Sequence, residues 1–165
     1  LGDVYKRQTL MVTHDPAEAM AMADRIAVLV DGEVVQFGTP EELWQRPNHP
    51  FVAATIADLQ PLKGRIEGTQ CVTAFGALPL RLLALTADLA EGTSVPIGVR
   101  PSSLTVSLEG PCVVNDIRFL GDRYTLLISA DNQSLEVATA LKPKVTVGDK
   151  VSISFAAAQA VILQP

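Results

Sequence analysis

The chain has 165 residues and a hydrophobic fraction of 48%, which suits one large or two small globular domains with a real core. Its formal net charge of −5 argues against a partner with a phosphate backbone, such as DNA or RNA, because such partners select basic surfaces. No apolar run approaches the ~20 residues of a membrane-spanning helix, and the sequence lacks the sustained apolar core of a cleavable signal.

The first predicted elements are a buried strand over residues 9–13 and a helix over residues 16–24, separated by His14. Asp15 stands where the helix cap is expected, and Pro16 occupies the first helical position, which proline favours. A helix N-terminus attracts anions because it gathers unpaired N–H groups and the positive end of the helix dipole. His14 could therefore bind a phosphate oxygen or a nearby water, or it is simply a polar residue between a strand and a capped helix.

A hairpin is predicted next, with strands over residues 26–30 and 33–37 joined by the Asp-Gly turn that ends at Gly32, a strong hairpin signal. A second helix then starts at Thr39, which is expected to cap it, with Glu42 completing a capping box. Together these elements predict an α/β arrangement for the first third of the chain.

A third helix is predicted over residues 51–59, ending before Pro61. Three of its side chains are expected to face inward: Phe51, Ala54 and Ile56. Trp44, on the second helix, could stack on a nucleotide base, but we expect it to anchor that helix to the sheet. His49 precedes a proline in a turn and is assigned no function.

From Leu62 onward the pattern changes to short alternating segments separated by Gly, Pro, Asp and Asn, which is typical of a small β-barrel or sandwich. Strands are predicted over residues 95–99, 113–119, 124–129, 135–139 and 151–155. In the last of these, Val151, Ile153 and Phe155 should point inward and the intervening serines outward. The Asp-Asn pair at residues 131–132 is expected to form a hairpin turn.

Several short motifs follow one another between residues 9 and 54: Val12-Thr13-His14-Asp15, Glu18-Ala19-Met20, Ala23-Asp24-Arg25-Ile26, Gly38-Thr39-Pro40-Glu41-Glu42-Leu43 and Phe51-Val52-Ala53. This stretch resembles the end of the nucleotide-binding domain in ABC-transporter ATPase subunits, most closely those of ferric iron, polyamine and sugar importers. The resemblance implies that His14 is the switch (H-loop) histidine, which senses the ATP γ-phosphate across a dimer interface. Phosphoryl transfer depends on positioning and charge stabilisation, so a donor beside that phosphate contributes strongly.

The motifs with which that family holds the nucleotide are not found in this sequence. It contains no loop of the form G-x-x-x-x-G-K-[ST] to cradle phosphates. The family's signature segment, Walker B aspartate with catalytic glutamate, and D-loop would belong upstream of residue 9. Residues 1–8 match no family segment and are treated as an unmatched leader. We therefore expect ATP and Mg²⁺ to bind the complete protein, and this chain alone not to hydrolyse ATP.

The second part of the chain also carries motifs with a family likeness: Gly98-Val99-Arg100-Pro101, Phe119-Leu120-Gly121 and Val147-Gly148-Asp149-Lys150-Val151. They resemble the TOBE domain, an OB-like β-barrel that follows the ATPase core in these importers. The resemblance implies an α/β C-terminal portion of an ABC ATPase domain at residues 9–60, followed by an all-β regulatory domain at residues 61–165. Arg100 could grip an oxyanionic regulatory ligand in bidentate fashion, or form a structural pair between strands. Ser102 and Ser103 stand where relatives often carry an acidic residue and a histidine.

The two cysteines, Cys71 and Cys112, lie far apart and lack the spacing of metal ligands. With the two histidines they make no zinc pattern, so no metal site is expected. We expect both to be small buried thiols, because a disulfide would be unusual in a cytoplasmic chain.

The sequence therefore predicts the C-terminal fragment of the ATP-hydrolysing subunit of an ABC importer, cytoplasmic and peripheral on the inner face of the cell membrane. The resemblance implies membrane subunits as partners, a homodimer in the full-length protein, an external solute-binding protein as an indirect partner, and no nucleic acid. The alternative is a free-standing TOBE-type module that binds a small solute or oxyanion without ATPase activity. A third possibility, a single-strand nucleic-acid binder, is disfavoured because the chain is acidic and only 5% aromatic. The transported substrate is not encoded here, since other subunits select it.

Overall fold

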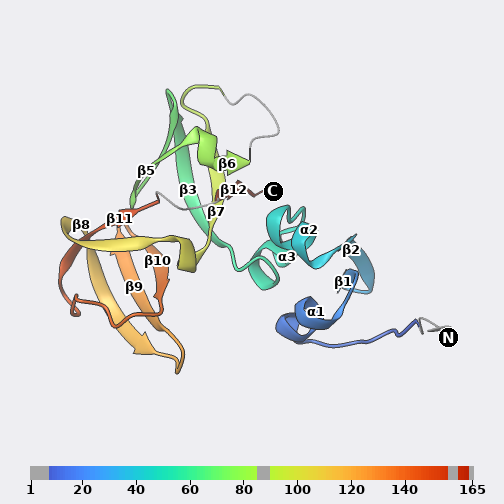
Figure 1. Cartoon of the computed structure of the whole chain (residues 1–165). Coiled ribbons are helices and arrows are strands. Elements are labelled where there is room, and N and C mark those ends of the chain that lie inside the picture. The colour runs from blue at the N-terminus through green and yellow to red at the C-terminus, as the bar shows by residue number, and fades with distance from the viewer. Residues whose placement is uncertain (1–7, 85–89, 156–159, 164–165) are drawn as a thin grey trace, which may run out of the picture.

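The computed structural model describes residues 8–84, 90–155 and 160–163 of the chain. Helices and one hairpin come first, and a larger β-rich part made of two sheets follows (Figure 1). Helices α2 and α3 lie between the hairpin and the β-rich part in Figure 1. The unmatched leader at residues 1–8 falls outside the described residues except for its last position.

The chain enters the described region as extended backbone and then forms helix α1 (Pro16–Met22). Asp15 caps this helix, because its side chain accepts hydrogen bonds from two backbone N–H groups of the first turn. The prediction of a buried strand over residues 9–13 was wrong: Leu10 is 93% exposed and Val12 is 92% exposed. A strand needs a neighbour to pair its N–H and C=O groups, and within the described ranges no strand pairs with this segment.

The predicted hairpin is confirmed as strands β1 (Ile26–Val30) and β2 (Glu33–Gly38), which pair antiparallel. The turn between them places Asp31 at φ 51° and Gly32 at φ 83°. Positive φ at both central residues is what a type I′ turn requires, and that turn matches the twist of the flanking strands. The local dipeptide thus sets the geometry of the hairpin.

Two short helices follow, α2 (Pro40–Gln45) and α3 (Pro50–Thr55). The predicted capping box of α2 is confirmed in both of its hydrogen bonds. The predicted inward face of α3 was wrong in two of three residues, because Phe51 is 44% exposed and Ala54 is exposed. The helix ends at Thr55 rather than at residue 59, and the buried residues of the predicted range are Val52, Ala53, Ile56, Ala57 and Leu59. The helix packs on two sides, with Val52 in the core of the hairpin and Ala53 against the β-rich part, so no single stripe describes it.

The first sheet of the β-rich part has the order β5-β4-β3-β7-β12-β6. Its strands are β3 (Gln60–Glu67), β4 (Gln70–Thr73), β5 (Gly76–Pro79), β6 (Leu83–Ala84), β7 (Ser94–Val99) and β12 (Ala160–Ile162). The pairs are antiparallel except for β12 with β6, which is parallel. Two short 3₁₀ helices adjoin this sheet, η1 (Leu80–Leu82) and η2 (Pro101–Ser103). Of these strands, the sequence pattern singled out only β7.

The second sheet has the order β10-β9-β8-β11. Its strands are β8 (Thr105–Phe119), β9 (Tyr124–Ala130), β10 (Gln133–Thr139) and β11 (Lys150–Ser154), all of which were predicted. Strand β8 starts earlier than predicted and bends, pairing with β11 in its first part and with β9 in its second. The predicted hairpin turn is confirmed, with Asp131 and Asn132 both at positive φ.

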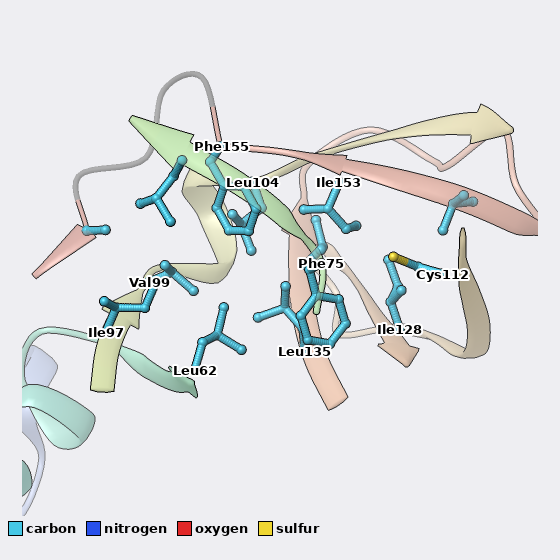
Figure 2. Close-up of a cluster of buried hydrophobic side chains, with 14 of the residues drawn as sticks. Leu62, Phe75, Ile97, Val99, Leu104, Cys112, Ile128, Leu135, Ile153 and Phe155 are labelled. Atoms are coloured by element: carbon cyan, nitrogen blue, oxygen red, sulfur yellow. The ribbon is translucent and has the colours of Figure 1, made fainter. Parts of the chain in front are cut away.

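The two sheets share one hydrophobic core. Figure 2 shows buried side chains of both sheets in one cluster, among them Leu62 and Ile97 of the first sheet and Ile128 and Leu135 of the second. The inward residues predicted for the last strand are buried, namely Val151, Ile153 and Phe155. The described part of the chain is therefore mostly β, and none of its helices is long and apolar enough to cross a membrane.

Candidate functional site

His14 lies in a bend between the extended segment and α1, and its side chain is exposed to solvent. The neighbours on both sides are engaged in local hydrogen bonds. Thr13 Oγ1 accepts from the Asp15 N–H at 3.0 Å, and Asp15 Oδ1 accepts from the Ala17 N–H at 2.8 Å. The expected capping role of Asp15 is thus confirmed. The backbone that presents His14 is fixed by these two contacts, while the imidazole itself faces water.

Arg100, in contrast to His14, is buried. It follows β7 directly, and within the described ranges it is the only buried charged or polar residue, with 5% of its surface exposed. Its Nε donates a hydrogen bond to the Ala57 carbonyl oxygen at 3.0 Å, and its Nη2 donates to the Trp44 carbonyl oxygen. Arg100 Cζ also lies 4.6 Å from the centroid of the Trp44 ring, within the range of a cation–π contact.

The electrostatics of Arg100 follow from this burial. Desolvation lowers the pKa of the guanidinium, and the negative charge of Asp58 acts in the opposite direction. An arginine side chain nevertheless stays protonated in proteins. A buried cation is tolerated only when polar groups replace its lost water, and here two backbone carbonyls and an aromatic face do so.

The contacts of Arg100 bear on both roles considered for it. Two of its hydrogen bonds connect the end of β7 to the helical segment, because Trp44 belongs to α2 and Ala57 follows α3. A regulatory oxyanion would have to displace these carbonyls or share the guanidinium with them. The ligand role of Arg100 stays a prediction. The structure does not bring Arg100 together with His14, which precedes α1.

Trp44 packs as expected, since one face of its ring is covered by the Arg100 guanidinium. Two polar side chains of the helical segment, His49 and Gln36, hold loops in place. His49 caps α3, because its Nδ1 accepts from the Phe51 N–H at 3.2 Å. The Gln36 side chain donates to the Arg46 carbonyl oxygen and accepts from the N–H of residue 48, both at 3.0 Å. A His-Pro pair at a helix start is the signal that could have shown the cap.

The side chain of Gln60 forms two hydrogen bonds with the backbone of a residue that is distant in the sequence. Its Nε2 donates to the Glu136 carbonyl oxygen at 2.9 Å, and its Oε1 accepts from the Glu136 N–H at 2.8 Å. Glu136 lies on β10, an edge strand of the second sheet. One side-chain amide thus pairs with the backbone as a neighbouring strand would. No sequence signal identifies this contact, because the two residues are 76 positions apart.

An open groove lies apart from the predicted site residues. It is lined by Leu108, Glu109, Gly110, Asp149 and Lys150. In the described part of the chain, no group of three or more His, Cys, Asp or Glu side chains could hold a metal ion. Cys71 and Cys112 are buried free thiols, as expected, and burial raises the pKa of both.

Comparison with known proteins gives a family match to the TOBE domain over residues 97–163. The chain is 35% identical to the Fe(3+) ions import ATP-binding protein FbpC of Streptomyces coelicolor, over 93% of this chain and 44% of that protein. It is 38% identical to the spermidine/putrescine import ATP-binding protein PotA of Acidothermus cellulolyticus, over 74% of this chain and 35% of that protein. The chain thus spans less than half the length of these relatives.

Proposed function

We propose that this chain, which is similar to ABC-importer ATP-binding proteins and matches the TOBE domain over residues 97–163, forms the C-terminal part of the cytoplasmic ATP-hydrolysing subunit of such an importer. The observation that carries the proposal is the extent of the similarity, which covers 93% of the chain in one relative. The TOBE match alone covers only residues 97–163. The relatives therefore contain both the helical segment and the β-rich part in one polypeptide.

The domain arrangement of the proposal divides the chain where the strands begin. Residues 9–60 are the end of the nucleotide-binding domain, and residues 61–165 are an OB-like TOBE domain with a regulatory role. Two sheets that share a core support this division on the β side. On the helical side, the support is the similarity to import ATP-binding proteins beyond the TOBE match.

His14 is proposed as the switch histidine of the complete protein, with its imidazole donating a hydrogen bond toward the ATP γ-phosphate. Its exposure and the fixed backbone on either side support this role. The sequence contains no loop of the form G-x-x-x-x-G-K-[ST] that would hold the phosphates of a nucleotide. ATP and Mg²⁺ are therefore assigned to the complete subunit.

The proposed partners follow from the import role that the names of the relatives state. The subunit would work at the inner face of the cell membrane with membrane-embedded subunits, as a homodimer, and only indirectly with an external solute-binding protein. Iron and polyamine importers both occur among the relatives. Their identities to this chain are similar, so they do not select one substrate.

The experiment that tests the proposal uses the importer subunit of which this chain is the C-terminal part. His14→Ala should leave ATP binding nearly unchanged and reduce ATP hydrolysis by about a hundredfold, as loss of a transition-state hydrogen-bond donor does. A matched variant, His49→Ala, changes the other histidine of the sequence and should leave turnover near the unchanged level. Full turnover in the His14 variant would contradict the assignment.

The alternative, a free-standing oxyanion-binding module, is not favoured by the similarity to ATP-binding proteins or by the contacts of Arg100. Calorimetry on the 165-residue chain with molybdate, sulfate and phosphate separates the two ideas. Micromolar binding that is lost in Arg100→Lys would support the module, because lysine cannot offer a bidentate fork.

A further inference from the structure

One side chain connects the helical segment with the β-rich part at three points. Arg100 belongs to the β-rich part, and its guanidinium contacts the carbonyl oxygens of Trp44 and Ala57 and the Trp44 ring, all in the helical segment. The guanidinium is buried among them. The positions of α2 and of the exit from α3 are thus both fixed to the end of β7.

A small apolar seam surrounds this contact. It comprises Ala53, Ala57, Leu59, Val161 and the partly buried Leu163. Gly98 of β7 leaves the space for it, because a Cβ there would lie 3.0 Å from Leu163 Cδ2 and 3.1 Å from Leu59 Cβ. The seam is built from few and mostly small side chains, so it provides shape but little apolar area.

The connection between α3 and β3 is short, and several of its residues make contacts that hold it in place. The Ala57 carbonyl oxygen accepts from Arg100, Leu59 packs in the seam, and Gln60 pairs with the backbone of β10. Asp58, between them, has a positive φ of 51°, a conformation that costs free energy for a residue other than glycine. The turn is therefore held by its contacts and does not act as a loose linker.

We propose that Arg100 and Trp44 form a latch that couples the two parts, so that a displacement of α2 is transmitted to β7 and η2. Backbone carbonyls on both sides of α3 accept from the same planar guanidinium, which fixes orientation as well as distance. A movement of α2 must then either carry the end of β7 with it or break the latch. The proposal depends on this geometry alone and holds whether or not the chain is part of an ATPase.

Two readouts on the 165-residue chain test the latch. Trp44 is the only tryptophan in the sequence, so its fluorescence and its quenching by acrylamide report on the latch alone. Hydrogen exchange compares the amides of α2 and α3 with those of β9 and β10. In Arg100→Met we expect stronger quenching of Trp44 and about tenfold faster exchange in α2 and α3, with β9 and β10 nearly unchanged.

Controls separate a latch from a general loss of stability. Arg123→Met removes an exposed arginine from the turn after β8 and should change neither readout. Arg100→Lys keeps the charge without the planar fork and should give a partial opening; it also serves if the methionine variant does not fold. In a double-mutant cycle, Trp44→Leu should add little to the exchange change already caused by Arg100→Met, because the contact of the Trp44 ring with the guanidinium is already lost in that variant.

Three results would overturn the proposal. Unchanged Trp44 quenching in both Arg100 variants would show that the contact does not hold α2. Equal acceleration of exchange in β9, β10, α2 and α3 would mean that Arg100 supports only the global fold. Full additivity of the Arg100 and Trp44 substitutions would mean that the two side chains act independently.

Discussion

The helical segment and the β-rich part of this chain differ sharply in the number of side chains that each buries in its hydrophobic core. Within the described residues, the helical segment has a cluster of five buried side chains: Ile26, Val28, Leu43, Val52 and Ile56. The cluster of the β-rich part has 20. Since burial of apolar surface is the main stabilising term, the β-rich part should set the stability of the chain.

The helical segment also leaves large apolar side chains in water. They include Leu10, Val12, Met22, Leu29, Val34, Phe37 and Phe51, all exposed by 44% or more. Leu29 and Val34 face each other across the hairpin, so they lie on one face of it. The comparison shows that local signals can form helices and a hairpin around only a small core, next to a larger neighbour.

The largest expected effect tests whether the β-rich part governs global stability. In Gly110→Ala, the new Cβ would lie 2.3 Å from the Val151 carbonyl oxygen and 2.4 Å from the Ser152 nitrogen. Backbone atoms cannot move aside as flexible side chains can, so we expect a loss of about 3 kcal/mol or more in unfolding free energy. Urea unfolding followed by circular dichroism measures it, with Ser134→Ala, at an exposed position of β10, as the control.

The next variant sharpens the same point by offering a rescue. A Cβ added at Gly64 would lie 2.3 Å from Cys71 Sγ, and we expect Gly64→Ala to lose about 2 kcal/mol of unfolding free energy. The clash is with a side chain, so Cys71→Ala removes it. The double variant should be more stable than the sum of the two single losses by about 1 kcal/mol. Simple additivity would show that the β3 and β4 backbones separate instead.

A smaller and local effect is expected in the helical segment. Thr39 caps α2, because its hydroxyl oxygen accepts a hydrogen bond from the Glu42 N–H at 3.2 Å. Thr39→Ala removes this cap and should lower the unfolding free energy by about 1 kcal/mol. Hydrogen exchange should accelerate in α2 while the strands of the second sheet stay protected, because the β-rich part has its own large hydrophobic core. Thr39→Ser keeps the cap and should behave like the unchanged chain. Faster exchange throughout would mean that the two parts unfold together.

The smallest effect is a dependence on alkaline pH that belongs to the β-rich part alone. Burial raises the pKa of the Cys71 and Cys112 thiols above that of the unfolded chain. The folded state therefore holds these protons more tightly, and stability is full below the unfolded pKa and falls as pH rises toward the folded one. Unfolding free energies between neutral and alkaline pH should fall less steeply in Cys71→Ala than in the unchanged chain.

The sequence predicted elements well wherever their signals were local. The capping box at Thr39, the turn at Gly32 and the alternation of Val151, Ile153 and Phe155 each depend on residues within a few positions of one another. The strands of residues 60–79 were not identified. They contain Gly64 and Gly76 and lack a long alternating run; β3, β4 and β5 pair with their neighbours in the sequence, and only the pairing of β3 with β7 joins them to a distant strand.

The candidate site was predictable only in part. His14 stands out in the sequence because a capped helix follows it, and the structure places it exposed beside that helix. Arg100 was recognised as a residue of interest from its motif, but the partners of its guanidinium were not. Those partners are a helix and a helix exit more than 40 positions earlier in the sequence, and no local pattern specifies them.

The sequence by itself determined the caps, the turns and the two-residue alternation of the long strands, because steric and hydrogen-bonding preferences act over a few residues. Tertiary structure alone decided which side of α3 is buried, that residues 9–13 stay unpaired in the described fold, and that Arg100 spans the junction rather than facing solvent. Each of these outcomes depends on which distant groups are available to pack or pair. The free energy gained or lost by burying a side chain depends on those groups, which come together only in the folded chain.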